Sequence, residues 1–315
     1  MSTTPTIPGI HHITAITADA QLNINFYHGI LGLRLVKLTV NFDDPSSYHL
    51  YYGDELGRPG TALTFFAWPG AYRGRVGPPQ VTATAFIVPV NSLEFWRQRL
   101  ASHQIFTSAP AERFGERFIS FSDPDGMPLE IIASAKSPAP TWPGSPVPSE
   151  HAIRAFHSAT ISEEGYEKTA SLLTDVMGFR QVASEQNRFR YRANSPDDFA
   201  STIDLLCIPD ARHGTLGAGI VHHIAFRAAD DAQQLAWRES ITRAGLNVSP
   251  VMERVYFHSI YFREPGGVLF EIATDLPGFT ADEPVAQLGK KLQLPPWLES
   301  HRAEIERSVP SINLP

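Results

Sequence analysis

One layout recurs four times along this chain of 315 residues, and no other feature constrains the fold as strongly. Each copy opens with a short apolar run typical of a β-strand and continues with residues in helical spacing. It then returns through further β-like runs. The opening runs cover residues 9–16, 81–87, 155–161 and 220–226. The pattern therefore predicts four modules, each made of a strand, a helix and three more strands.

Glycine and proline mark the ends of these predicted elements. Phe26, Ile30 and Leu31 share one face of a predicted helix over residues 23–31, and Gly32 follows it directly. Glycine also follows the third and fourth helical stretches, and it is the residue that best adopts the left-handed C-terminal cap. Three modules carry a proline–glycine turn before their last strand, at residues 58–60, 123–126 and 264–267.

The boundaries between larger parts follow from a proline-rich segment. Five prolines lie between residues 134 and 148, a density that neither a helix nor a central strand tolerates. We therefore expect an N-terminal half at residues 1–133, a linker at 134–152 and a C-terminal half at 153–275. A C-terminal arm at 276–315 follows, with a helical pattern over 298–307, and it either packs against the body or covers a site.

Composition narrows the classes of partner. The formal net charge of −7 gives no electrostatic support for binding nucleic acid or an anionic membrane. No apolar run approaches the ~20 residues that span a bilayer, and residues 1–9 lack the pattern of a secretory signal. Cys207 is the only cysteine, which excludes an intramolecular disulfide, and its apolar neighbours predict that it is buried. These features favour a soluble protein of the cytoplasm.

Placing the four modules in one register brings out a candidate metal site. The first strands align four residues, His12, Ala83, His157 and His223, and the last strands align Thr64, Glu130, Asp204 and Glu271. His12 and His223 share a position in modules one and four, and Glu271 ends module four. Two imidazoles and one carboxylate form a facial triad that leaves positions open on an octahedral metal. A buried Glu271 needs a partner, which is either a metal or a salt bridge.

Five further residues lie near this triad. His11 and His222 precede the two histidines, and strict alternation along a strand points them to the opposite face. Thr14 shares the face of His12, Tyr261 lies in the strand before Glu271, and Arg254 precedes that strand. Packing or surface roles stay open for Thr14, Arg254 and Tyr261.

Modules two and three give a second, incomplete set. It contains His157, Glu130 and Asp204, with Ala83 where the other histidine would be. We expect module one to meet module four and module two to meet module three. We also expect one metal per chain, because the second set lacks an imidazole and its members can satisfy one another by hydrogen bonds.

The motifs resemble those of the vicinal-oxygen-chelate superfamily, which includes glyoxalases, extradiol dioxygenases, fosfomycin-resistance enzymes and bleomycin-binding proteins. Within it, the chain is similar to the hydroquinone ring-cleaving dioxygenases of the 2,6-dichlorohydroquinone 1,2-dioxygenase group. The resemblance covers nearly the whole chain and rests on residues 10–14 (Ile-His-His-Ile-Thr), 48–61, 113–117, 203–206, 219–223 (Gly-Ile-Val-His-His), 265–271 and 294–298.

This resemblance implies an α+β fold in which four βαβββ modules, in two pseudo-repeated halves, form cupped mixed β-sheets. It implies Fe(II) as the metal, with Mn, Zn or Ni as alternatives in a purified sample, and an aromatic substrate, O2 and a homo-oligomer as partners. The implied metal ligands are again His12, His223 and Glu271. The implied catalytic residues are His11, Thr14, His222, Arg254 and Tyr261, of which His11, Arg254 and Tyr261 are the candidates for acid or base.

Three other functions remain open. A glyoxalase-type lyase or isomerase usually has a fourth protein ligand, which would fall at Thr64, a poor ligand. A metal-dependent thiol transferase also uses three ligands, although its chain is usually shorter. A drug-binding protein of the superfamily would generally lack the ligands altogether.

Overall fold

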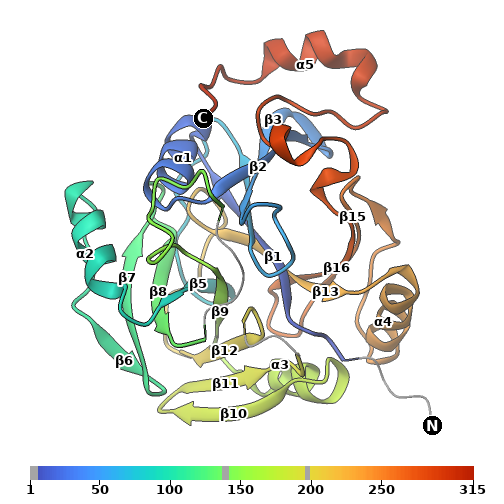
Figure 1. The fold of residues 1–315 in the computed structure, drawn as a ribbon. Coiled ribbons are helices and arrows are strands. Elements are labelled where there is room, and N and C mark those ends of the chain that lie inside the picture. The colour runs from blue at the N-terminus through green and yellow to red at the C-terminus, as the bar shows by residue number, and fades with distance from the viewer. Residues whose placement is uncertain (1–5, 137–141, 196–198) are drawn as a thin grey trace.

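Two eight-stranded sheets form the body of the molecule (Figure 1). The computed structural model describes residues 6–136, 142–195 and 199–315. The first sheet has the order β14-β15-β16-β13-β1-β4-β3-β2. Its strands come from modules one and four: β1 (Ile10–Thr17), β2 (Arg34–Asn41), β3 (Asp44–Gly53), β4 (Ala62–Ala67), β13 (Val221–Ala228), β14 (Met252–Glu253), β15 (Phe257–Arg263) and β16 (Leu269–Pro277).

The second sheet repeats this plan with modules two and three. Its order is β10-β11-β12-β9-β5-β8-β7-β6. The strands are β5 (Gln80–Pro89), β6 (Ala111–Arg113), β7 (Glu116–Ser122), β8 (Pro128–Ser134), β9 (Ala155–Glu163), β10 (Arg180–Glu185), β11 (Arg188–Arg192) and β12 (Thr202–Cys207). The predicted α+β fold of four βαβββ modules with cupped mixed sheets is confirmed.

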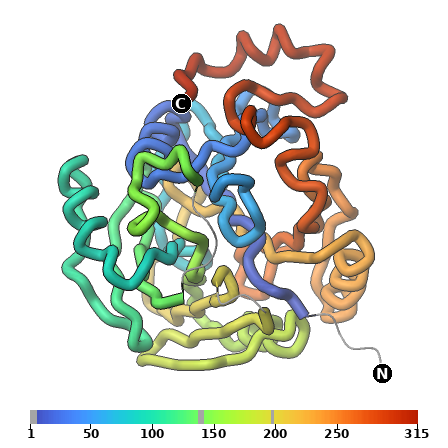
Figure 2. Tube along the Cα trace, in the orientation of Figure 1, coloured from blue at the N-terminus to red at the C-terminus, as the bar shows by residue number. Residues whose placement is uncertain are grey.

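The modules pair across the halves of the chain, as predicted. Strand β1 pairs antiparallel with β13, which joins module one to module four, and β5 pairs antiparallel with β9. The blue N-terminal strand therefore lies beside the orange C-terminal strands (Figures 1 and 2). Within each module the first and last strands are parallel neighbours, as in β13 and β16.

One helix per module packs outside the sheets. The helices are α1 (Ala20–Ile24) with its π-helical continuation η1 (Asn25–Ile30), α2 (Leu93–Ser102), α3 (Glu167–Ser171) with η2 (Leu172–Val176), and α4 (Asp231–Arg243). Asp19 and Asp230 cap two of them by accepting a backbone N–H with the side chain. The predicted glycine caps are confirmed, because Gly32, Gly178 and Gly245 have φ angles of 74°, 77° and 87°. No helix in the described ranges is both long and apolar enough to span a membrane.

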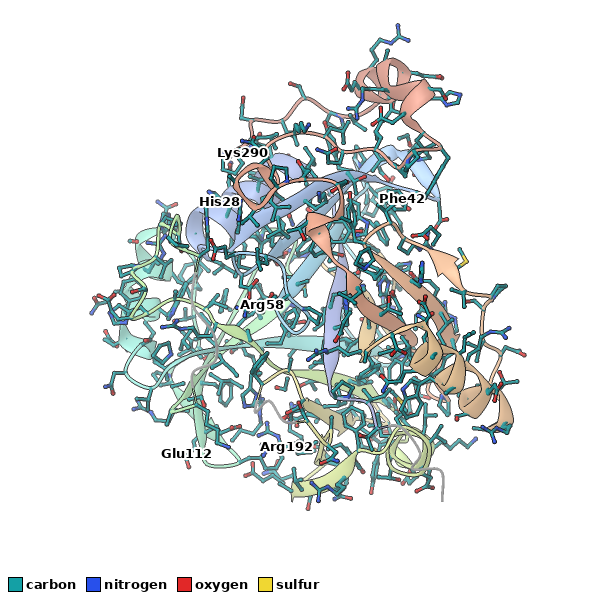
Figure 3. All side chains as sticks on the ribbon, turned by 45° about the vertical axis from the view of Figure 1, so that its right-hand side comes forward. His28, Phe42, Arg58, Glu112, Arg192 and Lys290 are labelled. Carbon is teal, nitrogen blue, oxygen red and sulfur yellow. The ribbon has the colours of Figure 1, made fainter. Side chains whose placement is uncertain are left out.

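The C-terminal arm lies over β2 and β3. The predicted helix over 298–307 is found as a 3-10 turn, η5 (Glu299–His301), followed by α5 (Arg302–Ser308). Gln293 donates its backbone N–H to Leu38, and the hydroxyl of Tyr48 donates to the carbonyl of Pro310. Phe42 lies at the tip of the β2–β3 hairpin (Figure 3), and its ring centroid is 5.7 Å from that of Trp297 of the arm.

Two smaller expectations have different outcomes. In the proline-rich segment, residues 137–141 lie outside the described ranges. Residues 1–5, part of the N-terminal stretch expected to lack a secretory signal, lie outside them too. The described residues 142–152 of that segment form no helix or strand, and Val147 and Ala152 are buried. The expected burial of Cys207 is wrong: the residue is half-buried at the end of β12, where its thiol lies 3.4 Å from the carbonyl of Glu164.

Candidate metal centre

Three adjacent strands place the triad on one face of the first sheet. His12 on β1 lies opposite Ala225 on β13, and Ala225 lies opposite Glu271 on β16. His223 precedes Ala225 by two residues and therefore shares its face. The small side chain of Ala225 leaves space between the two longer ones. The sheet register thus brings His12, His223 and Glu271 together, as the sequence predicted.

The ligand atoms of the three residues converge. Nε2 of His12 lies 3.3 Å from Nε2 of His223 and 3.4 Å from Oε2 of Glu271, while Nε2 of His223 lies 2.9 Å from the same oxygen. Ligands at about 2.1 Å from one ion are roughly 3.0–3.4 Å apart in octahedral to tetrahedral geometry. The triangle therefore has the size of a metal-binding set. Among the described residues, this is the one group of three or more that meets the geometric criteria for a metal site.

His11 differs from the prediction of strict alternation. It is the extra residue of a β-bulge, because Ile10 and His12 on β1 face the consecutive residues Phe226 and Ala225 on β13. The bulge brings the His11 ring alongside His12, with the two Nδ1 atoms 2.9 Å apart. His222 occupies a matching bulge on β13, and its Nδ1 lies 2.8 Å from Nδ1 of His223.

These contacts set the protonation of His12 and His223. Nε2 of His11 lies 3.1 Å from the carbonyl oxygen of Thr274, which can only accept, so this nitrogen carries a hydrogen. Burial and the neighbouring His12 lower the pKa of His11 well below its usual range, so the ring is neutral and its Nδ1 accepts. His12 therefore donates from Nδ1 and keeps a lone pair on Nε2. This is the orientation that metal-ligating histidines require.

His222 acts on His223 in a comparable way. Burial, followed by the neighbouring His223, lowers the pKa of His222 to about 3, so its ring is neutral. When His222 carries its hydrogen on Nε2, it accepts a hydrogen bond from Nδ1 of His223. Nε2 of His223 then carries no hydrogen, and its lone pair faces His12 and Glu271.

Glu271 also fits a metal ligand. It is fully buried, its Oε1 accepts a hydrogen bond of 2.5 Å from Ser259, and its Oε2 has no hydrogen-bond partner. Burial disfavours the charged form of this carboxyl, so its ionisation needs positive charge beside it, either from protonated His12 and His223, which lower its pKa well below the usual range, or from a bound cation. A buried carboxylate oxygen facing two imidazole lone pairs is costly without a cation. The donor set of two nitrogens and one oxygen suits Fe(II), Mn or Zn.

A cavity of about 30 Å³ borders the two histidines of the triad. Tyr261 lines it and lies opposite Glu271 in the sheet, with its ring centroid 5.8 Å from that of His223. Burial raises the pKa of Tyr261, so its phenol stays protonated. Arg254 donates from Nε to the Tyr261 hydroxyl at 3.3 Å and from Nη2 to Asp43 at 3.0 Å. The structure therefore places both predicted residues at the cavity.

The tip of the β2–β3 hairpin closes this cavity. Asn41, Phe42 and Asp43 all line it. The volume is far below the roughly 150 Å³ of a cavity that holds benzene. Side chains at the mouth must therefore move before an aromatic ring can enter.

Among the cavity residues that sequence reasoning missed are His49 and Tyr51 on β3. Nε2 of His49 lies 2.9 Å from Oγ1 of Thr64, and its Nδ1 lies 2.8 Å from the Tyr51 hydroxyl. Thr64 in turn lies 2.8 Å from the hydroxyl of Thr14. Alternation along β3, combined with its pairing to Thr64 on β4, is the signal that would have placed both residues on the face of the triad.

The second sheet shows that the predicted register of His157 is wrong. Ala83 on β5 lies opposite Thr160 on β9, just as His223 lies opposite Thr14. His12 therefore corresponds to Ser158, and His157 corresponds to His11. A slip of one residue exchanges the two faces of a strand. His157 even repeats the contact of His11, because its Nδ1 lies 2.9 Å from Oγ of Ser158. Both imidazoles, not one, are missing from this set.

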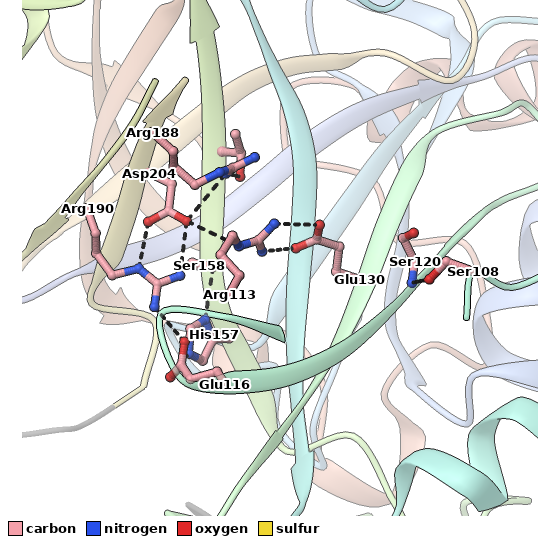
Figure 4. A network of polar contacts seen from close by, with 11 residues as sticks. Ser108, Arg113, Glu116, Ser120, Glu130, His157, Ser158, Arg188, Arg190 and Asp204 are labelled. Atoms are coloured by element: carbon pink, nitrogen blue, oxygen red, sulfur yellow. Dashed lines mark hydrogen bonds and ion pairs between the residues drawn. The ribbon is translucent and has the colours of Figure 1, made fainter. Parts of the chain in front are cut away.

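Arginines fill the second site (Figure 4). Arg113 donates twice to Glu130, at 3.1 and 2.5 Å, and Glu130 holds the position of Glu271 because it lies opposite Ala85 as Glu271 lies opposite Ala225. Arg190 donates twice to Asp204, at 2.8 and 3.0 Å. The carboxylates are satisfied by guanidinium groups, and not by one another as the sequence suggested.

Comparisons with known proteins agree with this architecture. The family model described as the Glyoxalase/Bleomycin resistance protein/Dioxygenase superfamily matches residues 9–131 and 155–272. A Bacillus subtilis (strain 168) protein named "Putative ring-cleaving dioxygenase MhqO" is 49% identical over 301 residues, which cover 96% of this chain and 95% of the relative. The "Chlorohydroquinone/hydroquinone 1,2-dioxygenase" of Sphingobium indicum is 37% identical over 310 residues, which cover 96% of each chain.

Solved structures extend the comparison. A crystal structure described as a putative dioxygenase from Bacillus subtilis subsp. subtilis str. 168 matches with a TM-score of 0.94 and 47% identity, covering 98% of each chain. Glyoxalase I from Zea mays matches with a TM-score of 0.63 and 13% identity over 85% of this chain and 92% of its own. The maize enzyme shows the likeness of the fold alone.

Proposed function

Because the chain belongs to the glyoxalase, bleomycin resistance protein and dioxygenase superfamily, we propose that it is an Fe(II)-dependent ring-cleaving dioxygenase. Its substrate would be an electron-rich dihydroxybenzene of the hydroquinone type, with catechols as the alternative, and O2 its co-substrate. The observation that carries the proposal is the buried triangle of His12, His223 and Glu271, whose three ligand atoms face one point. Relatives named for the same activity, similar over nearly the full chain, support it.

The residues around the triad suit this chemistry. A metal held by three protein ligands keeps positions open, and Fe(II) there would supply the redox chemistry with O2. Tyr261 presents a protonated phenol in the cavity, and Arg254 fixes that phenol and adds a positive charge beside it. Together they can hold a substrate oxygen that carries negative charge. The aromatic rings of Phe66 and Phe257 offer apolar walls for the substrate ring.

One observation argues against a glyoxalase-type reaction. The fourth ligand of that class would fall at Thr64, but this hydroxyl is already bonded to Thr14 and to His49. A hydroxyl held in this way is a weak metal ligand, and among the described residues no further carboxylate joins the triad. The low identity to the maize enzyme adds no support for shared chemistry.

The decisive experiment is oxygen uptake by protein loaded anaerobically with Fe(II). We expect consumption of O2 with hydroquinones and a ring-opened product detected by mass spectrometry. His12→Ala, His223→Ala and Glu271→Ala should each lose bound iron, whereas His213→Ala, at an exposed histidine, should keep it. Turnover of the methylglyoxal–glutathione adduct without O2 uptake on any phenol would move the protein to the glyoxalase class.

We also propose that the protein works in the cytoplasm as a homo-oligomer. The oligomer is supported by the family resemblance, and the cytoplasm by the single, half-buried cysteine. Light scattering on the purified protein and fractionation of the source cells test these two points.

A further inference from the structure

Tyr51 and His49 belong to a hydrogen-bonded row that crosses the first sheet and ends in the cavity. Tyr51 on β3 lies opposite Thr64 on β4, Thr64 lies opposite Thr14 on β1, and Thr14 lies opposite His223 on β13. The polar atoms of Thr14, Thr64, His49 and Tyr51 are linked by contacts of 2.8, 2.9 and 2.8 Å. The row therefore ties the Tyr51 hydroxyl to the strand that carries His12.

Packing fixes the same two rings. The His49 ring lies 4.0 Å from the Tyr51 ring and 4.4 Å from the Phe66 ring, centroid to centroid. Tyr51 is buried against Phe279 and Tyr256, and burial raises its pKa well above the usual range. Its phenol is thus protonated and held by these contacts, and Tyr51 lines the cavity.

The position of Tyr51 in the sheet indicates which part of a substrate it meets. Strands in a sheet are about 4.8 Å apart, so β3, two strands from β1, is about 10 Å from the backbone of His12. Tyr261, by contrast, lies directly opposite the ligand Glu271. Tyr51 therefore faces the end of a bound ring that is remote from the triad. In a hydroquinone, the second hydroxyl lies at that end.

We propose that Tyr51 binds the second hydroxyl of a hydroquinone-type substrate, and that His49 is the positioning residue that fixes the Tyr51 phenol for this contact. The proposal rests on the proposed function, since it assumes that the first substrate oxygen lies at the triad. Either tautomer of His49 serves. If His49 accepts the phenol hydrogen, Tyr51 accepts from the substrate, and if His49 donates, Tyr51 donates to the substrate.

The test compares two ligands that differ at that end of the ring. Hydroquinone and 4-methylphenol are titrated anaerobically into Fe(II)-loaded protein by calorimetry. Tyr51→Phe removes one hydrogen bond, so hydroquinone binding should weaken about three- to tenfold. Binding of 4-methylphenol should stay the same, because a methyl group makes no such bond.

Two further variants sharpen the test. Tyr52→Phe is the matched control, because Tyr52 is the next residue, faces the other side of the sheet and has a buried hydroxyl without a partner; both ligands should bind it as they bind the wild type. His49→Phe keeps a ring between Tyr51 and Phe66 but removes the hydrogen bond to Tyr51. Like Tyr51→Phe, this variant should bind hydroquinone more weakly relative to 4-methylphenol.

Several outcomes would overturn the proposal. Equal weakening of both ligands by Tyr51→Phe, or no weakening, would make Tyr51 a wall of the cavity only. Full preference for hydroquinone in His49→Phe would remove the positioning role. A wild type that does not prefer hydroquinone over 4-methylphenol would overturn both parts. Selective binding without O2 uptake would instead refute the proposed function and leave the Tyr51 contact standing.

Discussion

Glu163, at the end of β9, is a buried carboxyl whose oxygens make no well-formed hydrogen bond. It is 1% exposed, and neither of its oxygens has a hydrogen-bond partner. Glu264, also buried, accepts from Thr169 at 2.5 Å and from two backbone N–H groups at 2.7 Å. A Cβ atom at Gly266 would lie 2.6 Å from Oε1 of Glu163 and 2.9 Å from Oε1 of Glu264, so both carboxyls border the same glycine.

Modules one and two meet at a position equivalent to that of Glu163 and Glu264, but with a different contact. There the hydroxyl of Thr17 donates to Asp125 at 2.6 Å. The registers that match Thr14 to Thr160 and Asp123 to Glu264 put Glu163 in the place of Thr17 and Gly266 in the place of Asp125. The carboxyl therefore lies on the strand and not in the turn, and the hydroxyl that Thr17 supplies has no equivalent here. Two adjacent buried carboxylates cannot both ionise readily, so we expect Glu163 to carry a proton shared with Glu264.

The stability that this arrangement costs depends on pH. Burial and the charge of Glu264 raise the pKa of Glu163 from 4.5 to about 8. Between these values the folded chain holds a proton that the unfolded chain has released, so stability falls by about 1.4 kcal/mol per pH unit as pH rises. At pH 7 this amounts to about 3 kcal/mol. Solvent in the adjoining crevice screens the charge of Glu163, so we expect a cost of about 1.5 kcal/mol. That crevice is also lined by Glu164, Glu167, Lys168 and His213.

Glu163→Gln should remove this cost, because an amide resembles the protonated acid. We expect urea denaturation to show a gain of about 1.5 kcal/mol at pH 7, a larger gain at pH 8.5 and none at pH 4.5. Glu164→Gln, at the neighbouring exposed carboxylate, should change stability by less than about 0.5 kcal/mol at every pH.

A uniform loss of stability in Glu163→Gln at all three pH values would refute the reasoning. It would mean that Glu163 is ionised in the folded protein. Stabilisation of the wild type, but not of the variant, by added Ca2+ would then show that a cation offsets its charge.

Three other perturbations follow from the same structure. Arg113→Ala should lower the free energy of unfolding by about 3–5 kcal/mol in urea, because it leaves the buried Glu130 carboxylate uncompensated, while iron content stays unchanged. Ser259→Ala should weaken metal binding about 10- to 100-fold in a chelator competition, because it removes the hydrogen bond that orients Glu271. Removal of the metal with EDTA should lower the melting temperature, and the shift should vanish in His223→Ala, because a metal that binds only the folded state stabilises it.

The overall fold was predictable because its signals are local. Apolar alternation, helical spacing and the glycine caps at Gly32, Gly178 and Gly245 each depend on neighbouring residues only. The triad was predictable for a related reason. The repeat fixes the register of His12 and His223, and Glu271 interrupts an apolar run, where a buried carboxylate needs a partner.

The roles of His11 and His222 were not predictable in detail. Both lie at β-bulges, and a bulge arises from the pairing of β1 with β13, strands about 200 residues apart in sequence. A single strand read alone gives strict alternation, which points these side chains the wrong way. Tyr51 and His49 were missed because β4 lies between β3 and β1, the strand of His12. No residue on β3 indicates that it pairs with β4.

The register error at His157 came from aligning the modules on a histidine. Thr14 follows His12 by two residues, and Thr160 follows Ser158 by two. Alignment on the threonines would have matched His157 to His11. It would also have shown that the second cup, the site of Glu130 and Asp204 on the second sheet, lacks both imidazoles.

The first cup, the site of His12, His223 and Glu271 on the first sheet, and the second cup are equivalent. Comparing them shows which side chains favour a metal and which favour an arginine. Glu271 and Glu130 hold equivalent positions, and each is a buried carboxylate that requires positive charge nearby. In the first cup Arg254 turns away to Tyr261 and Asp43, which leaves Glu271 facing two imidazoles. In the second cup Arg113, in the register of Arg254, binds Glu130 directly. With Ser158 and Ala83 in place of the histidines, no nitrogen lone pairs remain to hold an ion there, and the guanidinium supplies the charge instead.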